Sequence, residues 1–462
     1  GQIAWIVENI YFSTYIQKNI TMEPWASSAT VAASAVVAAL VSIFGGVLTD
    51  RVGKRKVFVC FGYIVWGLVT AAFALFGNNH VSAESVVTVV VVFVIMDCVM
   101  TVFGSLSNDA AFSAWVTDVT DITNRGFVDV VLSIMPVAAL MIIFVGFDGL
   151  TQNGNWTTFF LLLGGMTSLS GVVGLFLMKD SPVLRPDRSG KYFAEVAYGF
   201  LPKSFAKHKM IYVCLFGMMF SGLSMQLWQP YMIVLLQYTL GFGDGYVLPL
   251  ALVVLLSAVI AVIGGKLMDK FGKEKFFYPV AAAGVLGGLI VYVIKFCGAN
   301  KALTFALFVV GGTLIEGASL LVAGLFNASA RDYTPKDKAG CFQGVRIIIY
   351  VTVPMILASL FTPLIINGFG EELKSYNDLI TSNSGYNIGD KVYPFELFLF
   401  SAVAAAFVFV PSVIVRKQAG EFRRKELFQI NADVEGNVDV ATEQQAAEQV
   451  DNTATDCNDK AE

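Results

Sequence analysis

The chain has 462 residues, of which 56% are hydrophobic and only 14% are charged, against roughly 25% charged in an average soluble domain. Its mean hydropathy is +0.68, and this composition excludes a soluble globular protein, because so few charged side chains could not cover its surface. The formal net charge of −4 comes from an acidic C-terminal segment, so it carries no information about a ligand.

Twelve apolar segments occur along the chain, and a membrane-spanning helix needs about 20 apolar residues. We therefore expect an all-α membrane protein with 12 transmembrane helices in two pseudo-symmetric six-helix bundles. The first segment begins at residue 1 without an initiator Met, so we expect helix one to be N-terminally truncated in this sequence. The segments lie near residues 1–17, 24–49, 57–77, 85–108, 127–147, 157–178, 210–238, 246–268, 277–297, 302–327, 341–367 and 395–415.

Lys and Arg are distributed unevenly between the connecting segments. With the N-terminus placed in the cytoplasm, 25 of them fall in cytoplasmic segments and 5 in outer segments, while Arg346 lies inside a span. Cytoplasmic connections of membrane proteins are enriched in Lys and Arg. We therefore expect both termini in the cytoplasm and a multi-pass protein of the cell membrane, plasma or inner.

The connections also predict where each bundle begins and ends. We expect an N-terminal bundle over 1–178, a cytoplasmic central loop over 179–209 and a C-terminal bundle over 210–425. Residues 426–462 contain ten acidic residues and one Lys among many Gln, Asn, Thr and Ala. Such a segment cannot bury an apolar core, so we expect a disordered acidic cytoplasmic tail.

A twelve-residue segment occurs twice, 219 positions apart, and Gly45–Lys56 shares seven identical residues with Gly264–Lys275. As a topology signal, its basic residues need no further role. As a conformational switch, its aspartates would pair with nearby Lys or Arg and with an adjacent helix N-terminus. We favour the switch, because the glycines indicate a close-packed turn. Its residues would be Gly46, Asp50, Arg51, Gly53, Arg55, Gly265, Asp269, Lys270 and Gly272.

Three acidic residues, Glu8, Asp97 and Glu316, fall near the middle of predicted spans. An ionisable group at that depth costs about 2.5–3.5 kcal/mol on insertion scales, so it is a candidate for function. Each acid lies on a helical face with other polar or aromatic side chains. Either the three carboxyls couple transport to a proton or a cation, or each is a structural hydrogen-bonding group. Three structural acids at one depth would be a costly coincidence, so we favour ion coupling.

Helix seven combines amides and aromatic rings between residues 226 and 231. Amides hydrogen bond to hydroxyl groups, and aromatic faces stack on apolar faces of a ligand, an arrangement that suits sugars. Ordinary interfacial packing explains Trp228 and Tyr231 equally well. The predicted substrate contacts, including two residues of helix one, are Asn9, Tyr11, Gln226, Trp228, Gln229 and Tyr231.

A cytoplasmic gate is also predicted. Arg346 lies one or two turns into helix eleven, and Asp129 is similarly placed in helix five. A weaker repeat relates the halves, because Asp118–Thr120 and Asp332–Thr334 each precede a glycine eight residues after the aspartate. The alternative is that Arg346 extends to the interface, as long cationic side chains do. The expected gate residues are Arg346, Asp129, Asp109 and Asp118.

The repeated turn resembles the loop 2–3 signature of the major facilitator superfamily, G-x-x-x-D-[RK]-x-G-[RK]-[RK]-[RK]. The first copy matches it throughout, and the second departs at Glu274. The resemblance covers the whole chain and implies a secondary transporter that works by alternating access. In the superfamily, helices one, four, seven and ten line the central cavity. On those helices lie Glu8, Asp97, Trp228 and Glu316.

Two further segments, Asn108–Thr120 and Asp332–Arg346, resemble the glycoside–pentoside–hexuronide:cation symporters and the related sucrose/proton symporters. This resemblance implies cation-coupled uptake of a sugar. Sodium-coupled melibiose-type members carry acids on helix two, whereas Ser27–Thr49 contains none. The difference favours protons, or no coupling at all.

We therefore expect proton-coupled or other cation-coupled uptake of a sugar or glycoside, and no enzymatic activity, cofactor, metal site or nucleic-acid partner. The expected partners are a small-molecule substrate, the proton or another cation, and the lipid bilayer around a monomer. One alternative is an exporter or lysolipid transporter of the same fold. An alternative of another class is a receptor or scaffold that does not transport and signals through the acidic tail.

Overall fold

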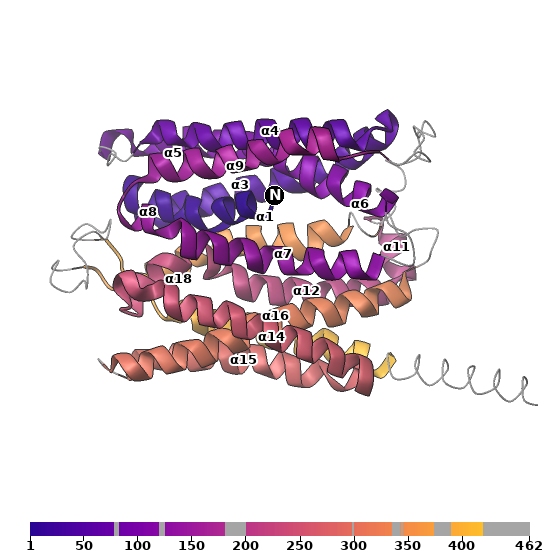
Figure 1. Ribbon diagram of the computed structural model, residues 1–462. Helices are drawn as coiled ribbons and strands as arrows, with labels where there is room; N and C mark the ends of the chain where they lie inside the picture. The colour runs from indigo at the N-terminus through magenta and orange to yellow at the C-terminus, as the bar shows by residue number, and fades with distance from the viewer. Residues whose placement is uncertain are drawn as a thin grey trace, which may run out of the picture.

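A computed structural model describes residues 1–77, 83–119, 125–180, 200–297, 300–334, 342, 345–373 and 390–418. These residues form long helices that run side by side, and Figure 1 shows them across their length. A single antiparallel bridge, Glu372 with Lys391, is the extended pairing found within the described residues.

The N-terminal half is built of helices in which several long spans consist of consecutive shorter segments. Their bounds are α1 (Gln2–Ile6), η1 (Val7–Phe12), α2 (Ser13–Tyr15), η2 (Ile16–Ile20), α3 (Pro24–Val52), α4 (Arg55–Ala72), η3 (Phe73–Phe76), η4 (Ala83–Ser85), α5 (Val86–Gly104), η5 (Ser105–Phe112), α6 (Ser113–Val119), α7 (Arg125–Gly146), α8 (Asp148–Gln152) and α9 (Trp156–Leu177).

The C-terminal half has the same character. Its helices are α11 (Pro202–Lys207), α12 (Lys209–Gln226), η6 (Gln229–Tyr231), α13 (Met232–Val234), η7 (Leu235–Thr239), η8 (Gly243–Tyr246), α14 (Val247–Phe271), η9 (Lys273–Lys275), α15 (Phe277–Val293), η10 (Ile294–Phe296), α16 (Lys301–Tyr333), η12 (Ile347–Thr352), α18 (Val353–Phe369) and α19 (Glu396–Ala406).

The predicted all-α membrane architecture is confirmed. Among the described residues, ten helices are long and apolar enough to cross a membrane. They coincide with ten of the predicted segments to within a few residues, except that some extend further at one end. The two other predicted segments, 1–17 and 127–147, are also helical, as α1 to η2 and as α7.

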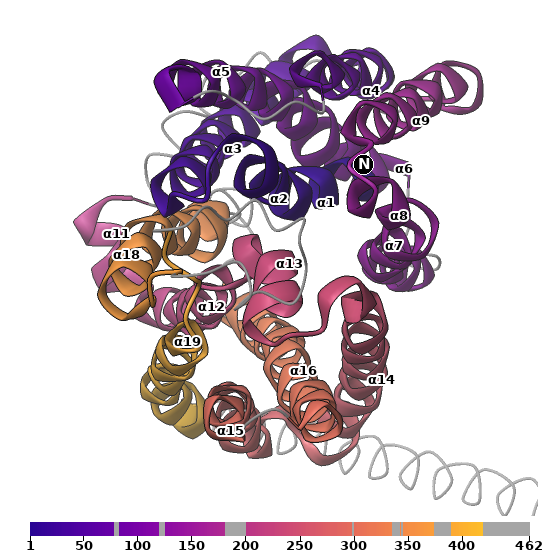
Figure 2. The same cartoon turned by 90° about the vertical axis from the view of Figure 1, so that its left-hand side faces the viewer.

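The helices gather in two groups, with α1 to α9 on one side and α12 to α19 on the other (Figure 2). Helix α3 packs against α18, and α7 packs against α14, so these pairs join the groups. The tail over 426–462 and most of the 179–209 loop lie outside the described residues, so their predicted boundaries and disorder stay predictions.

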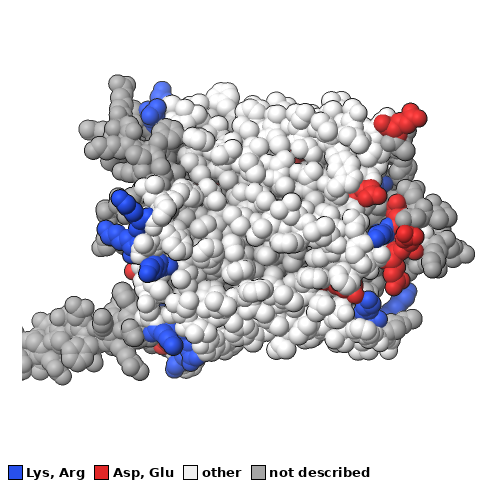
Figure 3. All heavy atoms as spheres, turned by 180° about the vertical axis from the view of Figure 1, so that it is seen from behind, with Lys and Arg blue, Asp and Glu red and all other residues white. Residues whose placement is uncertain are grey.

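Charged residues lie at the two ends of the helices, and a band without them lies between (Figure 3). Lys and Arg dominate one end, whereas the opposite end shows Asp and Glu beside Lys and Arg. The apolar band is the surface expected to face lipid. Following the Lys and Arg distribution, we name the basic end cytoplasmic and the opposite end outer.

The two repeated turns use glycine for the same physical reason. Helix α3 ends at Gly53, whose φ is +64°, and α14 ends at Gly272, whose φ is +90°. Residues with a side chain are strained at such φ angles, whereas glycine is not. The two glycines occupy equivalent positions of the repeat, so the duplicated sequence makes two helix ends that both require glycine.

Each turn is preceded by a pair of glycines, and the first glycine of each pair lies where two helices pack closely. A Cβ atom on Gly45 would lie 2.8 Å from Leu106, and one on Gly264 would lie 2.6 Å from Leu321. A Cβ atom on Gly265 would meet nothing within 4 Å. Gly45 and Gly264 are therefore the glycines at which helices pack closely. The sequence analysis had instead named the next residue in each copy, Gly46 and Gly265, as switch residues.

Candidate functional site

Two acidic side chains meet inside the N-terminal half. Glu8 of η1 and Asp97 of α5 are 7% and 0% exposed. The Thr101 hydroxyl, one turn after Asp97 on α5, lies 3.0 Å from Glu8 Oε1 and 2.8 Å from the backbone oxygen of Asp97, so its one proton is shared between these two acceptors. Ser34 of α3 is close to both carboxyls. We call Glu8 and Asp97 the carboxyl pair.

The carboxyl pair is under-satisfied in hydrogen bonds. Within the part of the chain that the structure describes, neither oxygen of Asp97 has a hydrogen-bond partner, and neither does Glu8 Oε2. Buried polar atoms are nearly always paired, because an unpaired one costs about 1–3 kcal/mol. Such unmet hydrogen-bonding capacity in a membrane interior marks a place where a proton, an ion or a polar ligand can bind.

The seventh span is interrupted beside helix one. Helix α12 ends at Gln226, the backbone turns at Leu227 and Trp228, and η6 restarts the span with Pro230 as its second residue. Proline lacks an N–H group, which explains why the regular helix does not continue through it. The freed carbonyl oxygen of Leu227 accepts a hydrogen bond from Thr362 Oγ1 at 3.1 Å.

The interruption brings predicted residues from both halves together. Element η6 packs against η1 and α2, so it lies against the helix that carries Glu8. The amides of Gln226 and Gln229 are half-buried next to this contact. On the helix-one side, Asn9 donates to the Trp5 carbonyl oxygen at 2.8 Å. The candidate site is therefore the junction of η1, α5 and the interrupted span.

Trp228 is buried in the C-terminal half and not in open space. Its side chain is 4% exposed, and its ring lies 5.4 Å from the ring of Phe398. The indole Nε1 has no hydrogen-bond partner among the described residues. A substrate role for Trp228 stays a prediction.

Tyr11 and Tyr231 lie nearer the outer end, in contacts that close it. Tyr11 and Tyr246 both donate to Asp148 Oδ1, at 2.8 and 2.6 Å, so Tyr246 reaches this carboxylate from the other half. The Ser28 and Tyr231 hydroxyls are 2.8 Å apart, again across the halves. We call these residues, together with Tyr393, which donates to the Met22 carbonyl oxygen at 3.0 Å, the outer clasp.

The outer clasp is buried. Tyr11, Tyr246 and Tyr393 are fully buried, and Asp148 is also 0% exposed. Asp148, Tyr246 and Ser28 were missed by the sequence analysis. An acidic residue in a short outer loop gives no sequence signal of burial, and its partners lie 137 and 98 residues away.

Glu316, the third predicted acid, lies in the C-terminal half on α16. It is partly exposed, and Tyr350 of η12 lies close both to it and to Arg346. The structure therefore brings Glu8 and Asp97 together, whereas Glu316 belongs to a separate group with Tyr350 and Arg346. A coupling role for Glu316 stays a prediction.

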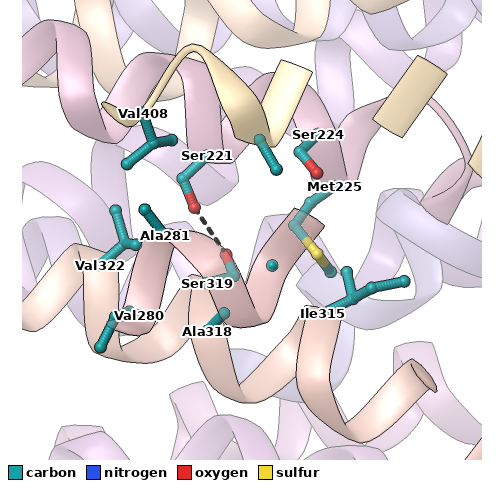
Figure 4. Close-up of a pocket in the computed structure, with 12 residues that line it drawn as sticks. Ser221, Ser224, Met225, Val280, Ala281, Ile315, Ala318, Ser319, Val322 and Val408 are labelled. Carbon is teal, nitrogen blue, oxygen red and sulfur yellow. Dashed lines mark hydrogen bonds between the residues drawn. The ribbon is translucent and has the colours of Figure 1, made fainter. Parts of the chain in front are cut away.

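The serines of helices seven and ten face one another inside the C-terminal half. Figure 4 shows Ser221 of α12 pointing at Ser319 of α16, with 3.4 Å between their oxygens. Ser224 is likewise 2.8 Å from Ser401 of α19. The cavity beside them measures about 10 Å³, which is too small for anything larger than one water molecule. These serines pack helices together and do not line a substrate cavity between the halves.

Among the residues that the structure describes, an ion pair lies at the cytoplasmic end of each half. Arg55 Nε donates to Asp118 Oδ2 at 3.1 Å, and Arg55 Nη1 donates to Thr49 at 2.7 Å. In the other half Lys273 bonds to Asp332. The two ion pairs lie at related places in the repeat. The position equivalent to Arg55 is occupied by Glu274 in the second copy, so the residue before it, Lys273, supplies the cation. Lys273 and Asp332 were not among the predicted switch residues.

The remaining predicted switch residues divide into those that can be placed and those that cannot. Asp109 accepts a hydrogen bond from Asn108 at 3.0 Å, and Asn108 accepts one from Tyr63 at 2.7 Å. Arg51 and Lys270 are exposed on their helix ends. The side chains of Asp50, Asp129 and Asp269 lie outside the described residues. All their switch roles stay predictions.

The sequence profile of the Major Facilitator Superfamily matches residues 3–365. The chain therefore belongs to the major facilitator superfamily, and it is a multi-pass membrane protein and a secondary transporter, not an enzyme. A search of curated protein sequences finds no match.

Solved structures of several transporters are similar to this chain in fold. A bacterial homolog of the human lysosomal transporter Spinster, inward-facing and unoccupied, has a TM-score of 0.62 at 14% identity over 92% of this chain and 95% of its own. A D-xylose-proton symporter has a TM-score of 0.63 at 11% identity over 90% and 93%. A mutant of the nucleoside transporter NupG has 0.61 at 10% identity over 90% and 98%. At these identities the likeness shows the fold.

Proposed function

We propose that this protein takes up a sugar or glycoside together with a proton, and that Glu8 and Asp97 carry the coupling. The observation that supports this proposal most is the carboxyl pair, in which two neighbouring buried acids accept a single side-chain hydrogen bond, from Thr101 to Glu8, and leave three carboxyl oxygens without partners. No other buried acids among the described residues combine this depth with so little hydrogen bonding.

Physical chemistry links such a pair to proton movement. Taking two carboxylates out of water costs several kcal/mol for each ion, and their mutual repulsion adds to that cost. At least one of the two carboxyls must then carry a proton while the pair is buried. Opening the pair to water lowers the cost and releases the proton, so access to water and protonation change together.

The substrate proposal has separate support. The amides of Gln226 and Gln229 lie at the interrupted seventh span, where backbone groups are also available for hydrogen bonding. Discontinuous helices form the substrate sites of many transporters. Amides and freed carbonyls suit a ligand with several hydroxyl groups. The resemblance to glycoside–pentoside–hexuronide symporters supports the same class, as does the likeness in fold to a D-xylose-proton symporter.

The outer clasp supports alternating access. It closes the outer end through three contacts between the halves: Tyr246 with Asp148, Tyr231 with Ser28, and Tyr393 with Met22. We propose that this is the inward-facing arrangement and that breaking these contacts accompanies outward opening. The two ion pairs at the cytoplasmic end, Arg55 with Asp118 and Lys273 with Asp332, would then rearrange in the outward-facing form.

A binding screen tests the substrate class. Detergent-purified protein is heated with single sugars and glycosides at several pH values, because a ligand that binds only the folded protein stabilises it by RT ln(1 + [L]/Kd) and so raises the apparent Tm. We expect one sugar class to raise Tm, with a pH dependence that Glu8→Gln abolishes. Stabilisation by none of the sugars, at any pH, would contradict the proposal.

Two other functions remain as outcomes of further tests. Uptake of labelled lysolipid into vesicles that sugars do not affect would favour a transporter of amphipathic compounds. Loss of function on deletion of residues 426–462, in a protein that transports nothing, would favour a receptor or scaffold. A transporter should tolerate that deletion.

A further inference from the structure

An apolar groove runs along the membrane-facing surface of the C-terminal half. It measures about 420 Å³ and lies between α12, α18 and α19. Its lining includes Leu223 of α12 and Leu227 just after it, together with Leu364 of α18 and Val403 of α19. Leu364 is 68% exposed and Val403 is 48% exposed. Because this surface lies in the apolar band, the groove faces lipid.

The groove has the length of half a bilayer. On α18 it extends from Phe361 to Phe369, which at 1.5 Å per residue is about 12 Å. Half of the hydrocarbon core measures about 15 Å. Phe369 is the last residue of α18 at the outer end, so the groove crosses the outer leaflet from the bilayer centre to its surface.

A polar cavity begins where the groove ends. It measures about 790 Å³, and Phe369 lines it as well, so the two spaces meet at this ring. Its charged lining residues are Lys295, Glu371, Glu372 and Glu396. Lys295 Nζ donates to Glu396 Oε1 at 2.7 Å, and Glu396 is 6% exposed. The lining therefore has two more acids than bases, next to one cation held in place.

We propose that the groove and the cavity together bind one outer-leaflet phospholipid whose headgroup carries a primary amine. One acyl chain lies in the groove, and the headgroup lies in the cavity. Its phosphate is placed beside Lys295, whose ammonium has donors beyond the one given to Glu396. Its ammonium donates to Glu371 and Glu372. This site is separate from the transport site and goes beyond the proposed function.

The headgroup must supply the selectivity. Lipid tails are as apolar as the groove, so entry of an acyl chain gives little net driving force inside a membrane. A primary ammonium can donate charge-assisted hydrogen bonds to carboxylates, whereas a choline headgroup has no N–H to donate. A lipid with only a negative charge meets an excess of acids. Lipids with identical chains and different headgroups should therefore bind differently.

Native mass spectrometry of the full-length protein tests this proposal. The protein is titrated with palmitoyl-oleoyl phosphatidylethanolamine, phosphatidylcholine and phosphatidylglycerol. We expect the ethanolamine lipid to bind about tenfold more tightly than the other two, the ratio that one charge-assisted hydrogen bond provides. The double variant Glu371→Gln/Glu372→Gln should lose this preference and still bind lipid.

A matched pair of variants locates the acyl chain. Leu364→Trp fills the groove, whereas Leu248→Trp places the same ring on α14, on another exposed apolar position that is 62% exposed. Leu364→Trp should remove the preferred ethanolamine lipid, and Leu248→Trp should leave it bound. Equal affinity for all three headgroups, or retention of the preference in Leu364→Trp, would overturn the proposal and identify ordinary surrounding lipid.

Discussion

At the scale of single residues, Thr101 is the side chain that holds Glu8 within the carboxyl pair. Its hydroxyl donates to Glu8 at 3.0 Å. Thr101→Val keeps the shape and removes that donor, whereas Thr101→Ser keeps the donor. We expect Thr101→Val to reduce gradient-driven uptake about tenfold, in line with the loss of a hydrogen bond to a charged or acidic group, and to shift its pH profile. Thr101→Ser should stay near wild type; equal effects of the two variants would argue against this role.

The two repeat-related ion pairs should differ in strength. Arg55 and Asp118 side chains are 7% and 25% exposed, whereas Lys273 and Asp332 are 27% and 33% exposed. A shielded charge-assisted hydrogen bond contributes about 1.5–3 kcal/mol, and an exposed ion pair about 0–1 kcal/mol. Asp118→Asn should therefore lower Tm in detergent more than Asp332→Asn does. The reverse order would contradict this ranking.

The sequence could be used to select the two acids of the candidate site, but it did not show which neighbours each polar helix face contacts. Helical stripes placed Glu8 and Asp97 on polar faces, and those two residues do meet. The stripes also grouped Ser221 and Ser224 with Trp228 and Tyr231, although the serines face α16 and α19. Periodicity defines a face, but tertiary packing decides which neighbour that face meets.

At the scale of helices, the two neighbouring glycines of α14 differ in how closely another helix approaches them. A Cβ atom on Gly264 would lie 2.6 Å from Leu321, whereas one on Gly265 would meet nothing. Overpacking costs about 1–3 kcal/mol. The atoms met are the ends of the Leu321 side chain, which can change rotamer, so Gly264→Ala should destabilise the protein by about 1 kcal/mol, the low end of that range, as measured by its Tm in detergent, and Gly265→Ala should not. Equal stability of the two variants would show that α14 and α16 move apart at no cost.

Helix positions followed from apolar length, whereas the break in span seven did not. Hydropathy predicted one segment over 210–238, and the structure divides it at Leu227 and Trp228. Pro230 was a visible signal. A hydropathy average does not reveal the break, because it sums side-chain polarity and takes no account of a missing backbone N–H group.

At the scale of the whole molecule, the outer clasp should bias the conformational equilibrium. Tyr246→Phe removes a hydrogen bond between the halves, whereas Tyr11→Phe removes one to the same Asp148 oxygen within one half. One hydrogen bond of about 1 kcal/mol changes a two-state population about fivefold. Tyr246→Phe should therefore raise the outward-open fraction, and Tyr11→Phe should change it less.

Spin-label distances report this fraction. Labels at Glu84 and Lys301 lie on exposed outer positions of the two halves, and they should move apart as the outer end opens. A distance distribution that is unchanged in Tyr246→Phe would show that the clasp does not control opening. The all-α membrane architecture could be predicted from apolar length, but the clasp could not, because it joins residues far apart in sequence.

Transport by the purified protein in liposomes tests the central claim most directly. With a sugar identified by the binding screen, an imposed inward proton gradient should drive accumulation by the wild type. Glu8→Gln and Asp97→Asn should each abolish accumulation while still exchanging labelled for unlabelled sugar across the membrane. Full gradient-driven accumulation by both variants would contradict the coupling role of the carboxyl pair.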